Sequence, residues 1–239
     1  MRSQVVDETN PVNLVVGALA TNCWVYAFTD DASVSGQGIW GSYQDKLCVL
    51  IDPGADASVL IARLERLQRY PRYILLTHGH FDHVAALAGV VSYYYETYKL
   101  APDIGIHKGD ASSLGPEAYE VHKESFTAAV GNAAYVDALW EPLPSPTLLL
   151  SEGDRIGPFT TLHLPGHSPG SAGFYDETAK VLFCGDTLFN GGMGRTDLPG
   201  GDFKTLLTSL KRLFALDEHI TAYPGHGSAT TIGAERSQY

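Results

Sequence analysis

The feature that most constrains this chain is the heptapeptide THGHFDH at positions 77–83, which follows the apolar segment YILL at positions 73–76. Four side chains that can bind metal fall within six positions of it: His78, His80, Asp82 and His83. A turn this rich in imidazole and carboxylate adds little to a core and is costly unless something binds it. The heptapeptide therefore predicts half of a dinuclear metal site at the end of a strand, with Asp186 as a downstream ligand.

Three further loops carry a candidate ligand, and each begins where a predicted strand ends. Their sequences are LPGHSPG (164–170), FCGDTLF (183–189) and YPGHG (223–227), which contain His167, Asp186 and His226 respectively. A glycine precedes each ligand and lets the backbone turn sharply toward a shared centre. Because strand ends gather at one edge of a sandwich, the four loops are predicted to meet there.

Imidazole and carboxylate ligands together suit zinc, iron or manganese and require no thiolate. Seven such residues are enough for two metals if Asp186 bridges them, so the predicted cofactor is two divalent ions, preferably zinc. Water held between two such ions is strongly acidified and can serve as an attacking hydroxide. Asp82 and Asp186 are predicted to be catalytic as well, because their carboxylates can orient that hydroxide. Four histidines lack this clustering and are predicted to be surface or core residues: His107, His122, His163 and His219.

The bulk properties are those of a globular protein with a sizeable core. The chain has 239 residues, of which 44% are hydrophobic and 18% are charged. Its formal net charge of −11 argues against sequence-independent nucleic-acid binding, which needs clustered lysine and arginine. No linker, low-complexity tract or short-period repeat divides the sequence, so we expect one domain over residues 1–239.

Cysteine usage and the N-terminus favour a cytoplasmic protein. The three cysteines are odd in number and match no thiolate metal motif, which favours a reducing compartment: Cys23, Cys48 and Cys184. The first residues carry acids and lack the apolar segment of a secretory signal. No stretch is long and apolar enough to span a bilayer, so we expect no membrane association. Nothing in the sequence indicates an oligomeric state.

Apolar and β-branched runs predict early strands at 12–16, 21–28 and 46–52, with a long loop over the polar residues 30–46. The strands come in clusters, with helices between and after them, which predicts two packed sheets covered by helices on the outside. The remaining strands are predicted at 73–76, 104–107, 147–150, 160–164, 172–175, 180–184 and 220–223.

Helical periodicity is clearest in three places. A helix is predicted from Ala57 to Tyr70, with Asp56 as its N-cap and Pro71 as its end. A second should start near His83 and run through Val90 toward the tyrosines at 93–95. A strongly amphipathic helix follows Asp202. Residues 101–146 are the least regular part, with an alanine-rich stretch that could be helical. The region 92–146, which includes Trp140, either walls a substrate cleft or packs in the interior.

The motif His-x-His-x-Asp-His, a distant single histidine, an aspartate and a terminal histidine together resemble the metallo-β-lactamase superfamily. The resemblance covers nearly the whole chain, from the strands before Asp52 to His226. It implies an α+β fold, the four-layer αβ/βα sandwich of two mixed sheets flanked by helices, with the metals at one edge. By motif, one metal would be held by His78, His80 and His167, the other by Asp82, His83 and His226, and Asp186 would bridge them.

Within the superfamily, the chain looks most like the single-domain members of the glyoxalase II (hydroxyacylglutathione hydrolase) group. The similarity lies in the segments GDTLF (185–189), GRTDLPGGD (194–202) and GSATTIGAE (227–235). It implies hydrolysis of a small-molecule thioester such as S-lactoylglutathione by a metal-bridging hydroxide. Several true β-lactamases place a cysteine ligand where this chain has Asp186, which disfavours that activity.

The chain departs from full glyoxalase II enzymes at its end. Those enzymes carry a C-terminal helical domain that helps to grip glutathione, and here only 13 residues follow His226. Arg195 could replace part of that grip by pairing with a substrate carboxylate. Alternatively, Arg195 fixes its own loop through a salt bridge with Asp197 or Asp202.

Three other functions remain open for this set of residues. The first is an iron-dependent persulfide dioxygenase, for which a single iron is expected at His78, His167 and Asp186. The second is a lactonase or other ester hydrolase that uses the same two metals. The third is a non-enzymatic binding module. Ribonucleases of the superfamily are disfavoured by the acidic charge and by the absence of an added nucleic-acid domain.

Overall fold

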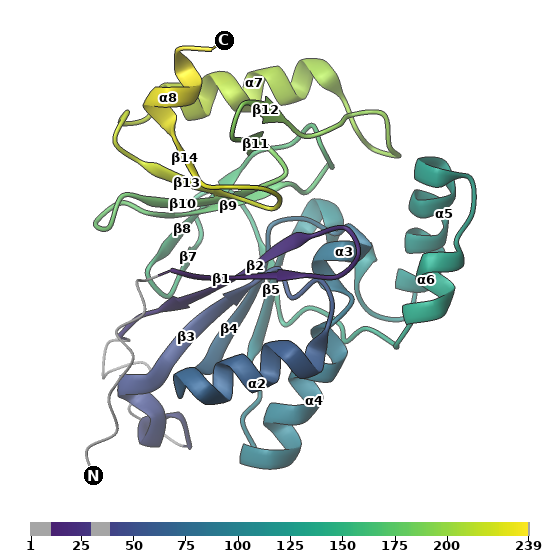
Figure 1. The fold of residues 1–239 in the computed structure, drawn as a ribbon, viewed down its shortest axis with the longest axis vertical. Coiled ribbons are helices and arrows are strands. Elements are labelled where there is room, and N and C mark those ends of the chain that lie inside the picture. Colours follow the sequence, from purple (N-terminus) through teal and green to yellow (C-terminus); the bar gives the residue numbers. More distant parts are fainter. Residues whose placement is uncertain (1–10, 30–38, 239) are drawn as a thin grey trace.

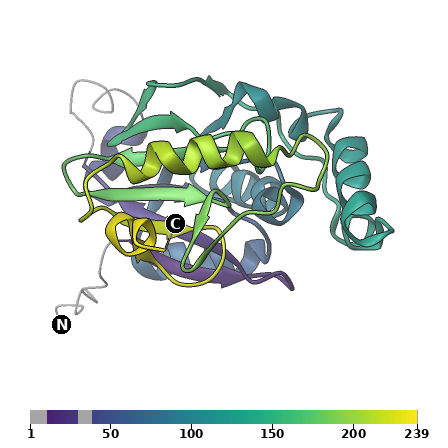
Figure 2. The ribbon, with the colours of Figure 1, turned by 90° about the horizontal axis from the view of Figure 1, so that it is seen from above.

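A computed structural model of the chain describes residues 11–29 and 39–238. Two six-stranded mixed sheets face each other, and helices cover their outer faces (Figures 1 and 2). The expected α+β sandwich of four layers, αβ/βα, is therefore confirmed. Three hydrophobic clusters hold the layers together, one under each helical layer and one between the sheets.

The first sheet contains, in spatial order, β1 (Val12–Val16), β2 (Thr21–Ala27), β3 (Leu47–Ile51), β4 (Tyr70–Leu76), β5 (Asp103–His107) and β6 (Leu148–Leu150). The pairs β1–β2 and β2–β3 are antiparallel, and the strands from β3 to β6 are parallel. Parallel neighbours need crossover connections. The helix α2 (Ala57–Leu67) joins β3 to β4, and α3 (Phe81–Val84) and α4 (Leu87–Tyr98) join β4 to β5.

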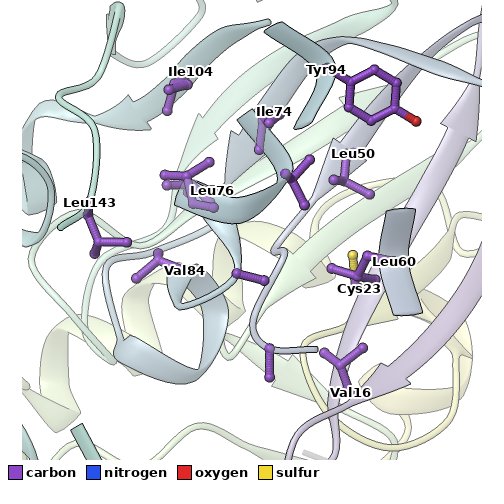
Figure 3. Packing of buried hydrophobic residues seen from close by; sticks show 14 of the residues in the cluster. Val16, Cys23, Leu50, Leu60, Ile74, Leu76, Val84, Tyr94, Ile104 and Leu143 are labelled. Carbon is purple, nitrogen blue, oxygen red and sulfur yellow. The ribbon is translucent and has the colours of Figure 1, made fainter. Parts of the chain in front are cut away.

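The helices α2 and α4 lie on the outer face of this sheet (Figure 1), and Figure 3 shows side chains of the buried cluster in which they pack. Leu60 and Leu64 of α2 and Tyr94 of α4 are fully buried in one cluster with Leu50 and Ile74 of the sheet. Burial of each such side chain contributes roughly 1.5–3 kcal/mol to folding. Packing against the sheet, more than helix propensity, therefore fixes where these two helices lie.

The second sheet contains, in spatial order, β14 (Thr230–Thr231), β13 (Thr221–Pro224), β10 (Val181–Gly185), β9 (Ala172–Asp176), β8 (Phe159–His163) and β7 (Arg155–Ile156). Only the pair β10–β13 is parallel among these described strands. The crossover between them carries the hairpin of β11 (Leu188–Phe189) and β12 (Gly192–Met193), followed by α7 (Phe203–Phe214). The short helix α8 (Ile232–Arg236) follows β14 and contacts α7.

Aromatic side chains fill the space between the sheets. Trp24 and Tyr26 of β2 contact Phe183 of β10, with ring centroids 6.0 and 5.8 Å apart. Phe159 and Phe174 complete the same buried layer. Because strands in both sheets alternate their side chains between two faces, this layer fixes how the sheets align and therefore where their strand ends meet.

Two details of the first predicted helix were wrong. The helix ends at Leu67, because Gln68 adopts a left-handed conformation (φ 52°) and its backbone N–H closes the last turn. Pro71 lies inside β4, opposite Cys48 at an irregularity in the register, and does not end the helix. Asp56 occupies the predicted N-cap position, but its carboxylate makes no capping bond and instead accepts a hydrogen bond from the backbone N–H of Gly17 (2.8 Å).

The second predicted helix is two helices, α3 and α4. The chain turns at Ala86, whose backbone N–H donates to the carbonyl of Pro53 (3.0 Å) and therefore leaves the helical ladder. The least regular region is more helical than its sequence indicates, and it contains the 3₁₀ helix η2 (Lys108–Ser113), α5 (Ala118–Val130) and α6 (Ala134–Leu139). The predicted loop at 30–46 becomes a 3₁₀ helix, η1 (Ile39–Lys46), in its second half, and residues 30–38 lie outside the described residues.

The described residues contain no helix that is both long enough and apolar enough to cross a bilayer. All three cysteines are buried as free thiols.

The helix α5 is attached through a buried histidine. His122 is 1% exposed, and its Nε2–H donates to the carbonyl of Ser113 in η2 (2.9 Å). Burial lowers the pKa of His122 to about 4. Because the pKa is about 6.5 in an unfolded chain, unfolding takes up a proton between these two values, and stability falls as the pH falls through that window.

We expect the titration of His122 to lower the free energy of unfolding by about 2 kcal/mol between pH 7 and pH 5. His122→Gln keeps a donor for Ser113 and should remove that part of the pH dependence. Urea unfolding of both proteins at the two pH values measures it, because the other buried histidines titrate equally in both. An identical pH dependence in the two proteins would contradict the assignment.

Candidate metal centre

The four candidate loops meet at one edge of the sandwich. The heptapeptide follows β4, the second loop follows β8, the third follows β10 and the fourth follows β13. Residues up to 148 positions apart in sequence, His78 and His226, thereby enter one site. The structure brings together all seven residues for which the sequence predicts metal binding: His78, His80, Asp82, His83, His167, Asp186 and His226.

Three imidazoles form the first group of candidate ligands. His167 Nε2 lies 3.3 Å from His78 Nε2 and 2.9 Å from His80 Nδ1. The Nδ1–H of His167 donates to the carbonyl of Arg195 (2.7 Å), and His78 Nδ1 lies 3.1 Å from the hydroxyl of Thr77. These outer contacts leave the unprotonated nitrogens of His167 and His78 facing the centre of the group.

The second group consists of a carboxylate and two imidazoles. Asp82 Oδ2 lies 3.6 Å from His83 Nε2 and 3.3 Å from His226 Nε2. The three atoms lie within 4.8 Å of one another. His83 Nδ1–H donates to Asp52 (2.9 Å), so Nε2 is the nitrogen of this ring that faces Asp82 and offers a lone pair when the ring is neutral.

Asp186 lies between the two groups. Its Oδ2 is 3.6 Å from His167 Nε2 and 3.6 Å from His226 Nε2, and its Oδ1 is 3.6 Å from His83 Nε2. One carboxylate therefore contacts an imidazole of the first group and both imidazoles of the second. Asp186 is therefore positioned where one carboxylate could serve both candidate groups.

Two atoms at this junction are buried and have no hydrogen-bond partner, His83 Nε2 and Asp186 Oδ1. A buried polar atom without a partner costs about 1–3 kcal/mol. With the His83 ring neutral, both atoms offer electron pairs 3.6 Å apart, so only a proton or a cation can satisfy them. The residues present therefore fit bound divalent cations, for which imidazole and carboxylate are suitable ligands.

The histidines of the two groups differ in the direction of their pKa shifts. Burial and the neighbouring His167 lower the pKa of His80 to about 3, and burial with the surrounding histidines holds the pKa of His78 well below its usual range. These rings are neutral at physiological pH and ready to act as ligands. Burial opposes the charging of His83, but Asp82 and the other nearby carboxylates outweigh it and raise its pKa to about 10. The second group thus attracts positive charge, which a metal ion would supply in place of a proton.

Asp52 is a residue of the site that the sequence analysis treated only as the end of a strand. Its side chain is 1% exposed and its backbone is left-handed (φ 53°). Oδ1 accepts the backbone N–H of Thr77 (2.8 Å), and Oδ2 accepts the Nδ1–H of His83 (2.9 Å). Asp52 therefore orients one ligand and anchors the start of the loop that carries the others, at the cost of backbone strain.

Asp110, at the start of η2, was missed as well. Its Oδ2 accepts the backbone N–H of Gly79 (2.9 Å) and the hydroxyl of Ser168 (2.6 Å), and its Oδ1 accepts the backbone N–H of Gly170 (2.6 Å). Gly79 lies between two ligands of the first loop, and Ser168 directly follows His167. One buried carboxylate thus holds the first and second ligand loops together.

The start of β2 holds the fourth loop. The hydroxyl of Thr21 donates to Asp82 Oδ2 (2.9 Å), and the Asn22 amide donates to the carbonyls of Pro224 (3.0 Å) and Gly227 (2.8 Å). The loop that carries His226 is therefore tied to the first sheet although it belongs to the second. Nothing in the sequence near these two polar residues distinguishes them from ordinary strand residues.

The glycines beside the ligands have the predicted role at two positions. Gly185, before Asp186, has φ 50°, a left-handed conformation that glycine adopts without strain. At Gly225, before His226, a β-carbon would collide with Asp186 Oδ1 and with the His83 ring. Both loops approach the centre more closely than a larger residue would allow.

None of the four histidines outside the motif belongs to the candidate ligand groups, although His122 lines the same cavity as five of the ligands. His107 and His163 stack on each other with ring centroids 3.9 Å apart, His122 attaches α5, and His219 is exposed. Tyr94 and Trp140 pack in the interior rather than lining a cleft, Trp140 by stacking on Phe81 (6.1 Å).

Arg195 lies at a cavity above the centre and pairs with a neighbouring residue. Its Nε and Nη2 contact the two oxygens of Asp197 at 2.7 Å each. Asp202 instead caps α7 by accepting the backbone N–H of Thr205 (2.8 Å). Of the two salt-bridge partners considered for Arg195, Asp197 is therefore the one that the structure shows.

Asp110→Asn should weaken metal binding, because an amide nitrogen would face a backbone N–H and push the first and second ligand loops apart. We expect affinity to fall by about 10- to 100-fold, the effect typical of residues that orient metal ligands. Competition with a chelating dye measures it. Asp103→Asn at the opposite end of β5, where Asp103 pairs with Arg72 (2.6 Å), is the control and should keep its affinity. Equal affinities in the two variants would refute the role of Asp110.

The sequence matches the family model of the metallo-beta-lactamase superfamily over residues 39–226. Hydroxyacylglutathione hydrolase GloC of Haemophilus influenzae is 36% identical over 215 residues, which cover 89% of this chain and 92% of that protein. The probable metallo-hydrolase YqgX of Bacillus subtilis is 36% identical over 200 residues, which cover 81% of this chain and 86% of that protein.

Solved structures of similar fold also match this chain over most of its length. TTHA1623 in a di-iron-bound form aligns with a TM-score of 0.71 at 38% identity, over 95% of this chain and 96% of that chain. The B3 metallo-beta-lactamase BLEG-1 aligns with a TM-score of 0.71 at 33% identity, over the same 95% and 96%. ETHE1 from Myxococcus xanthus aligns with a TM-score of 0.65 at 22% identity, over 95% of this chain and 82% of that chain, and it shares the fold.

The matched region includes all seven candidate ligands, and the fold is that of the solved relatives. The chain belongs to the metallo-beta-lactamase superfamily.

Proposed function

We propose that this chain is a metallo-hydrolase that cleaves small-molecule thioesters, with S-lactoylglutathione as the reference substrate. The observation that carries the proposal is the contact of Asp186 with both ligand groups, which supports a dinuclear centre. The name of the relative GloC, a hydroxyacylglutathione hydrolase at 36% identity, supports the substrate class.

In this proposal, His78, His80 and His167 would hold one divalent ion, Asp82, His83 and His226 would hold the other, and Asp186 would be a ligand shared by the two groups. The ligand set suits zinc, iron and manganese. We favour zinc, and the di-iron-bound form of the relative TTHA1623 makes iron the principal competitor. When bound, two such ions lower the pKa of a water molecule and polarise a carbonyl group.

The aspartates have an additional role toward the attacking water. Burial opposes the ionisation of Asp82, but His83 and His226 outweigh it and hold the pKa of Asp82 well below its usual range. An ionised carboxylate accepts hydrogen bonds only. Asp82 and Asp186 would therefore orient the water by accepting hydrogen bonds from its O–H groups, with its oxygen directed toward the substrate carbonyl.

The residues around the cavity favour a substrate whose leaving group needs no proton, and a thioester is such a substrate. His122 lines the cavity and has a pKa of about 4 because it is buried, so it is neutral at physiological pH and a poor acid. The described residues around the cavity otherwise offer proposed metal ligands, Arg195, a serine hydroxyl and apolar groups. A thiol with a pKa of about 8.5 leaves as a thiolate without help, whereas an amine or an alkoxide needs a proton.

Ring-opening hydrolysis of a lactone or lactam is the second candidate, because BLEG-1, at 33% identity, is a B3 metallo-beta-lactamase. A persulfide dioxygenase would use one iron at His78, His167 and Asp186 and would leave the second group without a function. That second group is fully assembled here, which favours two ions. Oxygen uptake with glutathione persulfide distinguishes this reaction from hydrolysis.

Asp186→Asn should lower both the metal content and the rate of S-lactoylglutathione hydrolysis, because the shared carboxylate is lost. We expect the rate to fall by more than about a hundredfold, beyond the effect typical of residues that only orient ligands. Elemental analysis and loss of the thioester measure the two quantities. Asp217→Asn is the matched control, since Asp217 pairs with Lys180 (2.7 Å) on the surface. Full metal content and rate in Asp186→Asn would refute the dinuclear centre.

A further inference from the structure

A cavity of about 260 Å³ lies directly above the candidate metal centre. Its floor is made of proposed ligands: His80, Asp82, His167, Asp186 and His226. Its sides include six apolar residues from four parts of the chain: Leu19, Phe81, Phe126, Ala129, Val130 and Leu198. A substrate that reaches the centre must therefore lie against apolar side chains.

One side of the cavity is a face of α5. Phe126, Ala129 and Val130 are spaced at i, i+3 and i+4, so they lie on the same side of the helix. The Phe126 ring stacks on Tyr135 with centroids 5.1 Å apart, which fixes its position. Figures 1 and 2 both show α5 and α6 at one edge of the sandwich, outside the four layers. The helix pair thus presents an apolar surface to the site, while Ala118 at the start of α5 belongs to the core cluster under α2 and α4.

Part of this apolar surface is open to solvent. The Val130 side chain is 60% exposed, and Leu19 across the cavity is 46% exposed. Covering such groups with an apolar molecule removes them from water, which is favourable in proportion to the area covered. The two residues flank the metal-binding floor, so a bound substrate is the molecule that would cover them.

The cavity is poorly suited to a charged arm. Among the described residues that line it, Arg195 is the only lysine or arginine, and the Asp197 carboxylate already pairs with it through two contacts of 2.7 Å. Glutathione carries two carboxylates and one ammonium group, and each needs a partner when it leaves water. A neutral arm needs no charged partner when it leaves water, so it can bind in this cavity without that free-energy cost.

We infer that the preferred substrate is a thioester with a neutral, apolar arm that lies along the Phe126–Ala129–Val130 face of α5. This inference rests on the proposed thioester hydrolysis and specifies its substrate class. The reaction is unchanged. The oxygen of water bonds to the acyl carbon, the C–S bond breaks with its electron pair on sulfur, and the protons of water pass to the products or to solvent.

Two series of neutral thioesters test the inference on the metal-loaded protein. One lengthens the acyl group from acetyl to hexanoyl on N-acetylcysteamine, and the other keeps a lactoyl group and lengthens an alkane thiol. In at least one series, kcat/KM should rise about two- to fourfold per methylene, as expected for burial of CH₂ groups. The series that rises identifies which arm lies along α5.

Two results separate the inference from the function on which it rests. If kcat/KM is flat in both series, or if S-lactoylglutathione exceeds every neutral substrate, the apolar-arm inference is wrong and thioester hydrolysis stands. If no thioester in either series is cleaved and S-lactoylglutathione is also stable, the proposed function itself fails.

Variants of Val130 provide the second test. Val130→Asp should raise KM for the longest neutral substrate by about tenfold, because it places charge beside the arm, and metal content should stay unchanged because Val130 is not a proposed ligand. Val130→Lys should also raise that KM, but it should lower KM for the anionic S-lactoylglutathione. Val59→Asp on α2, where Val59 is 55% exposed, is the matched control and should change neither value. Unchanged KM values in both Val130 variants would overturn the inference.

Discussion

The site depends on the concentration of negative charge and imidazole lone pairs around Asp186. A carboxylate between two groups of ligands is stable only if cations or protons neutralise it, and the surrounding histidines divide between these two solutions. The first group is kept neutral by burial, whereas the second gathers three carboxylates within reach of one ring. The rest of the fold brings these groups together and limits the access of water, which would otherwise hydrate their charges and lone pairs.

Two other buried carboxylates, those of Asp52 and Asp110, hold the candidate ligands in place. Asp52 fixes the ring of His83 and the first residue of the heptapeptide, and Asp110 joins the first loop to the second. Both accept backbone N–H groups, which are donors that do not depend on side-chain conformation. The ligands are therefore positioned through the main chain, and their geometry does not rely on the rotamers of long side chains.

The ligand loops could be predicted from the sequence because four ligands lie within one short run and the others follow apolar strands next to glycine. Asp52 and Asp110 could not, since a single aspartate after a strand resembles an ordinary turn residue. The helix before β4 was extended too far because its apolar spacing continues past Leu67, while the left-handed Gln68 that ends it has no strong signature. The role of α5 was hidden because its sequence lacks a strong apolar stripe, and its small apolar face points at a cavity instead of the core.

The origin of the ligands has a consequence for folding. His78, His80, Asp82 and His83 follow a strand of the first sheet, whereas His167, Asp186 and His226 follow strands of the second. Each of the two ligand groups draws on both sheets, so any ion bound there acts as a staple across the sandwich. An ion that binds only the assembled form stabilises it by mass action. The supply of metal would then affect how stably the two sheets remain packed together, as well as whether the centre is active.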